Sequence, residues 1–382
     1  MHICFLSHEY PKPGLNPGGV GVFLYTFSHS LVSVGHSVTI LGANDSKEDE
    51  DQANGNLRII RFGTPSLPGI NWMFIAKKLN TYLKEINKSK KIDIVEGSEL
   101  ALAFLTKIPS ITYVIRLHGG HHFFSDSENR PVNFWKGFQE KRSFKKADAF
   151  IAVSDYVRIH TAKYLSFHQK PLATIRYMID QNRFSYRAEY PEAKPYSLTF
   201  AGTICEKKGV GNLVAAMPQV ISHFPEASLD IYGKEWFFPN GESYTDLIKN
   251  KIEKMGLGDK IKIHPPVSHD QIPTIYSKAS ICIFPSFMET QGLVAPEAML
   301  MGKVVIFTDK GPGPETITHG ENGFLCNPLE VSNIEDTIIT AFRAREKFTE
   351  IGKEAYLKAS QMFNVSNVLE RNLSFYNSVI DG

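Results

Sequence analysis

The sequence predicts an α/β protein of two domains, each built on a parallel β-sheet with helices on its faces. Short apolar segments alternate with segments of helical spacing, the alternation pauses at residues 177–197, and it then starts again. The 382 residues also suffice for two hydrophobic cores at roughly 100–200 residues per domain. We therefore expect a first domain over residues 1–180, a second over residues 181–364, and a final helix within residues 365–382.

The first domain opens with a strand–helix–strand unit. Residues 2–7 form a short apolar strand, and residues 22–34 place Phe23 and Phe27 at helical spacing before the chain turns at Gly35. This order of elements implies a parallel sheet. Further strands of this domain are expected at residues 37–41, 57–62, 92–95, 111–116 and 149–153, and further helices at residues 74–91 and 134–146.

The segment at residues 177–197 is interpreted as a linker, because it contains Pro191 and Pro195 and few aliphatic residues. The alternation of strands and helices then returns and predicts a second domain of the same class. Its strands are expected at residues 197–202, 229–232, 261–264, 281–284 and 304–307, with a helix around residues 213–220.

The composition is that of an ordinary soluble protein, with 42% hydrophobic and 21% charged residues. The chain starts with an apolar strand rather than a signal peptide, and no apolar run approaches the roughly 18 residues that span a bilayer. The four cysteines lack zinc or redox spacing and are expected to be free thiols in a reducing compartment. These features predict a cytoplasmic protein.

Charge is distributed unequally along the chain. Residues 1–200 hold 25 Lys and Arg against 18 Asp and Glu, whereas residues 201–382 hold 17 against 22. A basic first half favours an anionic ligand or surface, although halves of a chain also differ by chance. The expected helix at residues 134–146 carries Trp135 and Phe138 beside its lysines, so it suits either packing on the core or peripheral contact with the inner face of a membrane. The acidic run at residues 48–51 is expected to be a solvated loop.

A first glycine cluster, at Gly18, Gly19 and Gly21, lies between a strand and a helix. Bare backbone at a helix N-terminus lets a phosphate or a sugar approach the N–H groups, and a tight turn is the structural alternative. The cluster lacks the G-x-G-x-x-G spacing, and no acidic residue ends the second strand. A dehydrogenase is therefore not favoured.

A second glycine-rich loop runs from Gly202 through Thr203 and Lys208 to Gly209, again between a strand and a helix. A lysine beside a glycine-rich helix start suits a diphosphate, because it adds a mobile charge to oriented N–H dipoles. A lysine-rich surface loop is the structural alternative.

The third cluster follows the expected strand at residues 281–284. Glu289 falls in the loop, and Pro296 favours a helix start that puts Glu297 on its first turn. Both carboxylates then face the carboxyl edge of the sheet, where open α/β folds bind ligands. They are suited to accept from vicinal sugar hydroxyls, and the N–H groups near Gly292 and Leu293 to meet a phosphate.

This segment resembles the donor loop of the retaining family 4 glycosyltransferases, in which two glutamates are separated by seven residues, as Glu289 and Glu297 are here. Residues 311–315 (GPGPE) and 320–325 (GENGFL) resemble the turns that follow it, and the likeness extends over essentially the whole chain. The resemblance implies the GT-B fold: two Rossmann-like domains separated by a deep cleft, with the last helix crossing back to the first domain. It also implies that the second domain binds a nucleotide sugar and the first domain the acceptor.

The same resemblance implies roles for single residues. Glu297 would bind the ribose hydroxyls, Glu289 the transferred sugar, and Lys208 the diphosphate. His118, in the segment Arg-Leu-His-Gly-Gly, matches the active-site histidine of the family, although alone it reads as a loop histidine with a structural hydrogen bond. The expected catalytic residues are thus His118, Glu289 and Lys208. The other expected donor contacts are Gly18, Gly19, Gly202, Thr203, Gly292, Leu293, Val294 and Glu297, with Pro266 and Val267 at the base.

The chain departs from the family pattern in two places. Thr203 stands where relatives usually have an arginine, so one diphosphate cation is missing unless Lys207 or Arg176 replaces it. Tyr177 and Met178 replace the usual asparagine–glycine pair before the linker. The change at Thr203 affects the expected binding of the donor diphosphate. The change at Tyr177 and Met178 affects the expected backbone geometry of the hinge before the linker.

The expected reaction transfers a hexose from a UDP- or GDP-linked donor to a hydroxyl of a glycan, lipid-linked or small-molecule acceptor, in polysaccharide or glycoconjugate biosynthesis. The sequence shows no carboxylate pair placed for double displacement and no D-x-D motif in a convincing setting, so we expect a front-face retaining reaction with no metal and no cofactor. The alternatives are a catalytically weakened scaffold subunit and a GT-B epimerase or phosphorylase. A nucleic-acid partner is not favoured, because the basic excess is small and no recognised motif is present.

Overall fold

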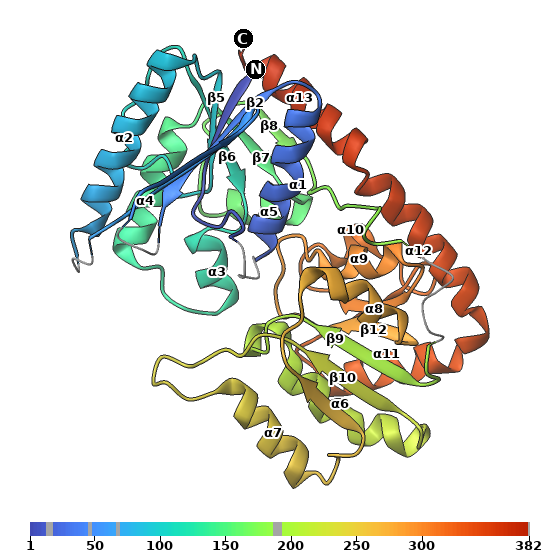
Figure 1. The fold of residues 1–382 in the computed structure, drawn as a ribbon. Coiled ribbons are helices and arrows are strands. Elements are labelled where there is room, and N and C mark those ends of the chain that lie inside the picture. The colour runs from blue at the N-terminus through green and yellow to red at the C-terminus, as the bar shows by residue number, and fades with distance from the viewer. Residues whose placement is uncertain (13–17, 45–47, 66–68, 186–192, 381–382) are drawn as a thin grey trace. The chain divides into compact units, whose positions relative to one another are not determined.

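The structure is a computed structural model that describes residues 1–12, 18–44, 48–65, 69–185 and 193–380 (Figure 1). It divides into two compact units. The first comprises Met1–Met178 and Val365–Gly382, and the second comprises Ile179–Asn364. The division thus falls two residues before the boundary expected from the sequence, and residues 365–382 belong to the first unit. Pro191 of the expected linker lies outside the described residues.

The described residues of the first unit form an eight-stranded sheet in the order β3-β4-β2-β1-β5-β6-β7-β8. Neighbouring strands pair in parallel, except for β3 and β4, which are antiparallel. The strands are β1 (His2–Leu6), β2 (Ser37–Ala43), β3 (Glu50–Asn54), β4 (Leu57–Phe62), β5 (Ile94–Gly97), β6 (Thr112–Leu117), β7 (Ala149–Ala152) and β8 (Leu172–Thr174).

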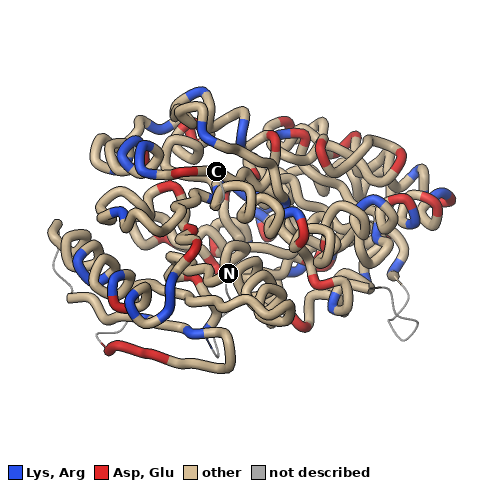
Figure 2. Tube along the Cα trace, turned by 90° about the horizontal axis from the view of Figure 1, so that it is seen from above, with Lys and Arg blue, Asp and Glu red and all other residues tan. Residues whose placement is uncertain are grey.

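The expectation that the acidic run is a loop was wrong for its second half. Glu50 and Asp51 begin β3, an edge strand that pairs with β4. The arginines of β4 stabilise this pairing, since Arg58 binds Asp51 at 2.6 Å and Arg61 binds Glu50 at 3.0 Å. Cross-strand ion pairs of this kind offset the low strand propensity of acidic residues. The acidic run is visible as a continuous red segment in Figure 2.

Helices cover both faces of the first sheet. Figure 1 shows α2 and α4 on one face and α1 and α13 on the other. The helix α1 begins three residues earlier than expected, since Gly18 is its N-cap and the carbonyl of Gly18 accepts from the N–H of Val22 at 3.0 Å. The helices are α1 (Gly19–Ser33), α2 (Asn71–Ser89), α3 (His121–Ser127), α4 (Phe134–Lys146), α5 (Asp155–Ala162) and α13 (Val365–Ile380).

The second unit is a doubly wound parallel sheet. Its described residues form six strands in the order β11-β10-β9-β12-β13-β14, all paired in parallel. The strands are β9 (Ser197–Ala201), β10 (Ser228–Tyr232), β11 (Ile261–His264), β12 (Ile281–Phe284), β13 (Val304–Thr308) and β14 (Phe324–Cys326). Every residue of β9, β12 and β13 is buried, as expected for strands covered on both faces.

Helices α6, α7 and α11 lie on one face of this sheet, and α8, α9 and α12 lie on the other (Figure 1). Single turns of 3₁₀ helix at Glu206–Lys208, His269–Gln271 and Arg345–Lys347 complete the unit. The helices are α6 (Val210–His223), α7 (Tyr244–Lys254), α8 (Ile272–Ser277), α9 (Val294–Leu300), α10 (Gly313–Thr316), α11 (Val331–Arg343) and α12 (Phe348–Met362).

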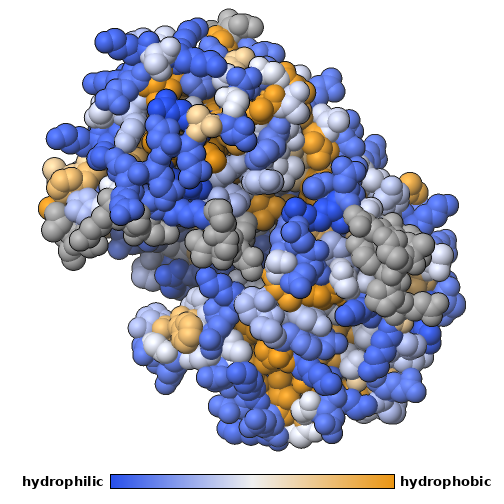
Figure 3. Space-filling view, viewed as in Figure 1, coloured by the Kyte–Doolittle hydropathy of each residue, from blue (hydrophilic) through white to orange (hydrophobic). Residues whose placement is uncertain are grey.

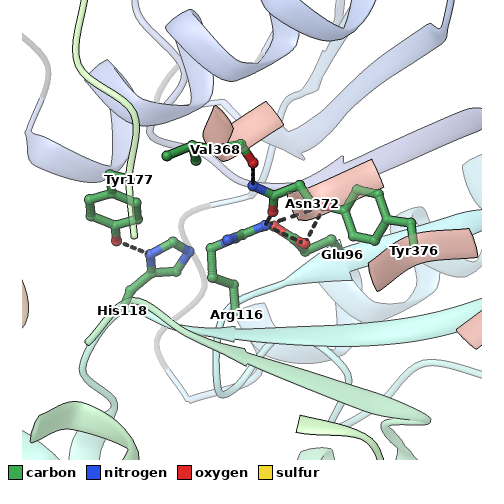
Figure 4. Close-up of polar contacts among 7 residues, drawn as sticks. All are labelled: Glu96, Arg116, His118, Tyr177, Val368, Asn372 and Tyr376. Atoms are coloured by element: carbon green, nitrogen blue, oxygen red, sulfur yellow. Dashed lines mark hydrogen bonds and ion pairs between the residues drawn. The ribbon is translucent and has the colours of Figure 1, made fainter. Parts of the chain in front are cut away.

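The last helix, α13, is fixed to the first unit by a buried polar cluster (Figure 4). Arg116 of β6 binds Glu96 of β5 through two hydrogen bonds, at 2.7 and 3.1 Å, and donates to the side-chain oxygen of Asn372 at 2.7 Å. Tyr376, one turn further along α13, donates to Glu96 at 2.6 Å. All four side chains are buried. The cluster therefore pairs a buried cation and a buried anion with polar groups of α13, and Nη1 of Arg116 is the one nitrogen of this guanidinium that has no hydrogen-bond partner among the described residues.

Candidate active site

In the second unit, the residues singled out from the sequence follow three strands of one parallel sheet. Gly202, Thr203 and Lys208 follow β9, Pro266 and Val267 follow β11, and Glu289 through Glu297 follow β12. Because β9 and β12 are neighbours and all strands are parallel, these segments leave the sheet at the same edge. This is the edge at which open α/β sheets bind ligands.

Lys208 and Glu289 form the centre of this edge. Lys208 ends the 3₁₀ turn at Glu206–Lys208, and its ammonium group donates to Oε1 of Glu289. The side chain of Lys208 is 26% exposed and that of Glu289 is 10% exposed, so both remain accessible to a ligand while in contact. A cation and a carboxylate are thus placed side by side at the ends of adjacent strands.

The backbone of the two loops holds this pair in place. The N–H of Phe287 donates to the carbonyl of Lys207 at 2.8 Å. Gly209 has a φ of +72°, and a Cβ there would lie 1.9 Å from the carbonyl oxygen of Pro285. Only glycine accommodates both the left-handed conformation and this close approach. The glycine therefore brings the β9 loop against the β12 loop.

Glu297 lies on the first turn of α9 and is buried. His269 donates to it, with Nε2 at 3.3 Å from Oε1, and Arg183 lies with Nη1 at 2.6 Å from Nδ1 of the same ring. A guanidinium only donates, so Nδ1 must accept and Nε2 must carry the proton. Arg183 and His269 were not predicted from the sequence, because no spacing links them to Glu297. The one signal in the sequence that pointed to His269 was its position two residues after Val267, which was expected at the base.

The remaining second-unit positions form the surroundings of these side chains. Gly292 has a φ of +70°, and a Cβ there would lie 2.5 Å from the ring of Phe307. Leu293 and Val294, at the start of α9, are half-buried. Thr203 is half-buried two residues after β9, Pro266 is exposed, and Val267 is half-buried.

In the first unit, His118 directly follows β6. Its Nδ1 is hydrogen-bonded to the hydroxyl of Tyr177 (Figure 4). Desolvation, with a smaller contribution from the Arg116 guanidinium, lowers the pKa of His118 from 6.5 to about 3. Burial raises the pKa of Tyr177 well above 10. The pair is therefore a neutral imidazole bound to a protonated phenol near pH 7.

Aromatic stacking connects this pair to the buried cluster. The ring of Phe23, in α1, stacks on Tyr177 with centroids 4.4 Å apart. The guanidinium of Arg116 lies 5.0 Å from the centroid of the same Phe23 ring. Arg116 thus contacts Asn372 of α13 and also the Phe23 ring that stacks on Tyr177, the partner of His118. Tyr177, which stands where the family usually has an asparagine, thus provides the hydroxyl that binds His118. The sequence did not indicate this role.

Two buried glutamates hold the backbone after His118, and neither was singled out from the sequence. Glu99 accepts from the N–H of Gly119 at 2.8 Å, and Glu140 accepts from the N–H of His122 at 3.0 Å. A Cβ at Gly120 would lie 2.1 Å from Glu140, so the loop requires glycine there. Burial, with the nearby charge of Glu140, raises the pKa of Glu99 to about 8.

The first glycine cluster is described only in part, because residues 13–17 lie outside the described residues. Gly18 caps the N-terminus of α1 in an extended conformation, with φ of −72°. A Cβ at Gly18 would lie 3.4 Å from the carboxylate of Glu9. Gly19 is the first residue of α1 and is exposed.

Three further observations concern metal ligands, membrane-spanning helices and cysteines. Within the described part of the chain, no group of three or more His, Cys, Asp or Glu side chains is placed to hold a metal ion. No helix of those same residues has the length and apolar character to cross a membrane. The four cysteines are free and buried.

Two units, each built on a largely parallel sheet with helices on both faces, have the architecture of the GT-B class. The profile of group 1 glycosyl transferases matches residues 182–358, and that of glycosyltransferase family 4 matches residues 17–183. The chain therefore belongs to the group 1, family 4 glycosyltransferases, and it is a glycosyltransferase.

Individual relatives agree with this assignment. The chain is 23% identical to the glycogen synthase of Mycobacterium tuberculosis, over 87% of this chain and 84% of that protein. Among solved structures, sucrose-phosphate synthase from Thermosynechococcus elongatus superposes with a TM-score of 0.86, at 19% identity, over 100% of this chain and 99% of that one. HepE from Anabaena, in complex with UDP and glucose, gives a TM-score of 0.77 at 18% identity, over 99% and 100% of the two chains. The two structural likenesses show the fold.

Proposed function

We propose that this glycosyltransferase moves a hexose from a nucleoside diphosphate sugar to an acceptor hydroxyl with retention of anomeric configuration, in polysaccharide or glycoconjugate biosynthesis. The observation that carries the proposal is the contact between Lys208 and Glu289 at one sheet edge. A diphosphate needs a cation and a sugar needs hydrogen-bond acceptors, and this edge supplies both within a few ångströms. The Anabaena relative solved with UDP and glucose supports a donor of this class.

The residues of the second unit then take distinct roles. Lys208 neutralises the charge that develops on the departing diphosphate, and Glu289 accepts from hydroxyls of the transferred hexose. Glu297, oriented by His269, accepts from the ribose hydroxyls. Gly202, Thr203 and the backbone at residues 292–294 complete the donor site, and the backbone at residues 266–267 contacts the base.

The chemistry proposed is a front-face displacement. The acceptor oxygen bonds to the anomeric carbon on the face from which the diphosphate leaves. The bond between that carbon and the phosphate oxygen breaks, and the hydroxyl proton passes to the departing phosphate. The protein supplies charge stabilisation and orientation, and no carboxylate acts as a nucleophile. In the first unit, the neutral His118 is proposed to hydrogen-bond the donor sugar, with Gly18 and Gly19 near the diphosphate.

Four measurements test the proposal. Calorimetric titration with UDP, GDP and ADP identifies the base, and failure of all three to bind would reject the donor class. Hydrolysis of the matching nucleotide sugar without acceptor distinguishes an enzyme from a scaffold subunit. Proton NMR of the anomeric signal in the product reports retention, and an inverted product would reject the front-face mechanism. Transfer abolished by EDTA would contradict the proposed independence from metals.

A further inference from the structure

The first unit contains a cavity of about 370 Å³ at the carboxyl edge of its sheet. Its floor is made by the last residues of β1 and β2 and by the turn after β5, and α2 covers it. The strands β1, β5 and β6 are consecutive in the sheet, so this edge is also the edge that carries His118. The volume lies in the range of small-molecule sites.

The lining of this cavity is mostly apolar, and its polar side chains are those of Ser7, His8, Ser98 and Gln139. Its large apolar side chains include those of Leu6, Leu41, Trp72, Ile75, Leu79 and Phe104. Among the described residues that line it, His8 is the one with a titratable side chain, and none is Asp, Glu, Lys or Arg. A phosphate moved into such surroundings would lose its hydration without meeting a Lys or Arg side chain, and a sugar would regain only the hydrogen bonds that a few polar side chains offer. An alkyl chain would gain affinity of about fourfold for each methylene buried.

The cavity continues into an exposed aromatic patch. Trp72 lies with its ring centroid 4.3 Å from Phe104 and 5.3 Å from Trp135, at the start of α4. Around these rings, Met73 is 54% exposed and Phe134 is 86% exposed. Figure 3 shows apolar side chains gathered at the left edge of the first unit, over the beginning of α2. Contiguous exposed apolar surface of this kind marks a binding site.

The two helices that carry the patch also carry exposed cations. Lys77 of α2 and Lys136, Lys141 and Arg142 of α4 are exposed. The guanidinium of Arg142 lies 5.9 Å from the centroid of Phe104, which lines the cavity. An apolar cavity with a cationic border is complementary to an amphiphile with an alkyl chain and an anionic head group.

We propose that this cavity binds the apolar chain of the acceptor, and that the acceptor is therefore a lipid-linked molecule with an anionic head group. The proposal rests on the function proposed above and names the acceptor class for it. The chain would occupy the space beneath α2, and the head group would lie against the cations of α4. The hydroxyl that receives the hexose would then stand at the same sheet edge as His118.

The experiment uses cis-parinaric acid, a fluorescent long-chain fatty acid with an anionic head, titrated into the full-length protein. We expect saturable binding, and competition by saturated fatty acids that strengthens about fourfold for each added methylene until the cavity is full. The variant Ala76→Phe fills the cavity from α2 and should weaken binding at least about tenfold. The control Thr81→Phe makes the same kind of change at an exposed position of α2 and should bind as the wild type does.

If Ala76→Phe lowers the melting temperature, Leu79→Asn keeps the branching of the lining side chain, makes its end polar, and should also weaken binding. Absence of binding to the wild type, or equal binding by the wild type and the folded cavity variants, would overturn the inference. Titration of the same samples with nucleoside diphosphates separates the two proposals. Nucleotide binding without fatty-acid binding rejects the acceptor class alone, and fatty-acid binding without nucleotide binding rejects the donor function and the acceptor role with it.

Discussion

Lys208 and Glu289, 81 positions apart in the chain, meet at the ends of β9 and β12, where the ammonium group of one donates to the carboxylate of the other. Each neutralises the other before any ligand binds. When the donor binds, its diphosphate would therefore take the place of Glu289 as the partner of Lys208, and a sugar hydroxyl would take the place of Lys208 as the partner of Glu289. Because both side chains are largely shielded from water, removal of either leaves a charge with fewer partners.

Replacement of Lys208 is expected to weaken donor binding. Lys208→Met keeps the aliphatic stem and removes the charge, so one charge-assisted hydrogen bond to the diphosphate is lost. Such a bond contributes about 1.5–3 kcal/mol, which corresponds to a loss of affinity of roughly 10- to 100-fold. Calorimetric titration with the preferred nucleoside diphosphate measures it. The control is Lys207→Met, the exposed neighbouring lysine, and an equal loss in both variants would assign the diphosphate contact to the wrong lysine.

Replacement of Glu289 is expected to act on turnover. Glu289→Gln keeps the shape of the side chain but removes the negative charge that orders the sugar hydroxyls and balances Lys208. We expect kcat to fall by about 100-fold or more, as when a preorganised polar contact to the reacting group is removed. Steady-state transfer or donor hydrolysis measures kcat, and the melting temperature checks folding. Glu321→Gln, at an exposed position, should behave as the wild type. Unchanged kcat in Glu289→Gln would remove this residue from the catalytic set.

The sequence predicted the two-unit α/β fold because short strands such as β9, β12 and β13 alternate with segments of helical spacing, whereas the three-residue strand β14 was not expected. It also predicted Glu289 and Glu297, whose seven-residue separation is a local signal. The side chains that orient them carry no such signal. His269 and Arg183 reach Glu297 only through the fold, and Glu99 and Glu140 reach the loop after His118 in the same way. The strand β3 was missed because its acidic residues are stabilised by the arginines of β4, which periodicity cannot reveal.

The buried cluster at the last helix is expected to contribute strongly to stability. Tyr376→Phe removes one donor to Glu96 and should lower the free energy of unfolding by about 1–2 kcal/mol. Arg116→Met leaves Glu96 buried without its cation and should lower it by about 3–5 kcal/mol. Urea denaturation followed by circular dichroism measures both. Tyr356→Phe, on the exposed side of α12, is the matched control. Equal stability of Arg116→Met and the wild type would contradict the role of the cluster.

The low pKa of His118 predicts a specific pH dependence of stability. In the folded protein this imidazole takes up its proton only near pH 3, whereas in the unfolded chain it does so near pH 6.5. Between these values the unfolded state binds more protons, so the contribution of His118 to stability is full above pH 6.5 and is lost as the pH falls toward 3. His118→Gln cannot bind a proton, so its stability should decline less than that of the wild type between pH 7 and pH 4.5. Urea midpoints at the two pH values measure the difference, with His223→Gln, at an exposed position, as the control. Parallel declines in the wild type and His118→Gln would show that His118 is not desolvated in the folded protein.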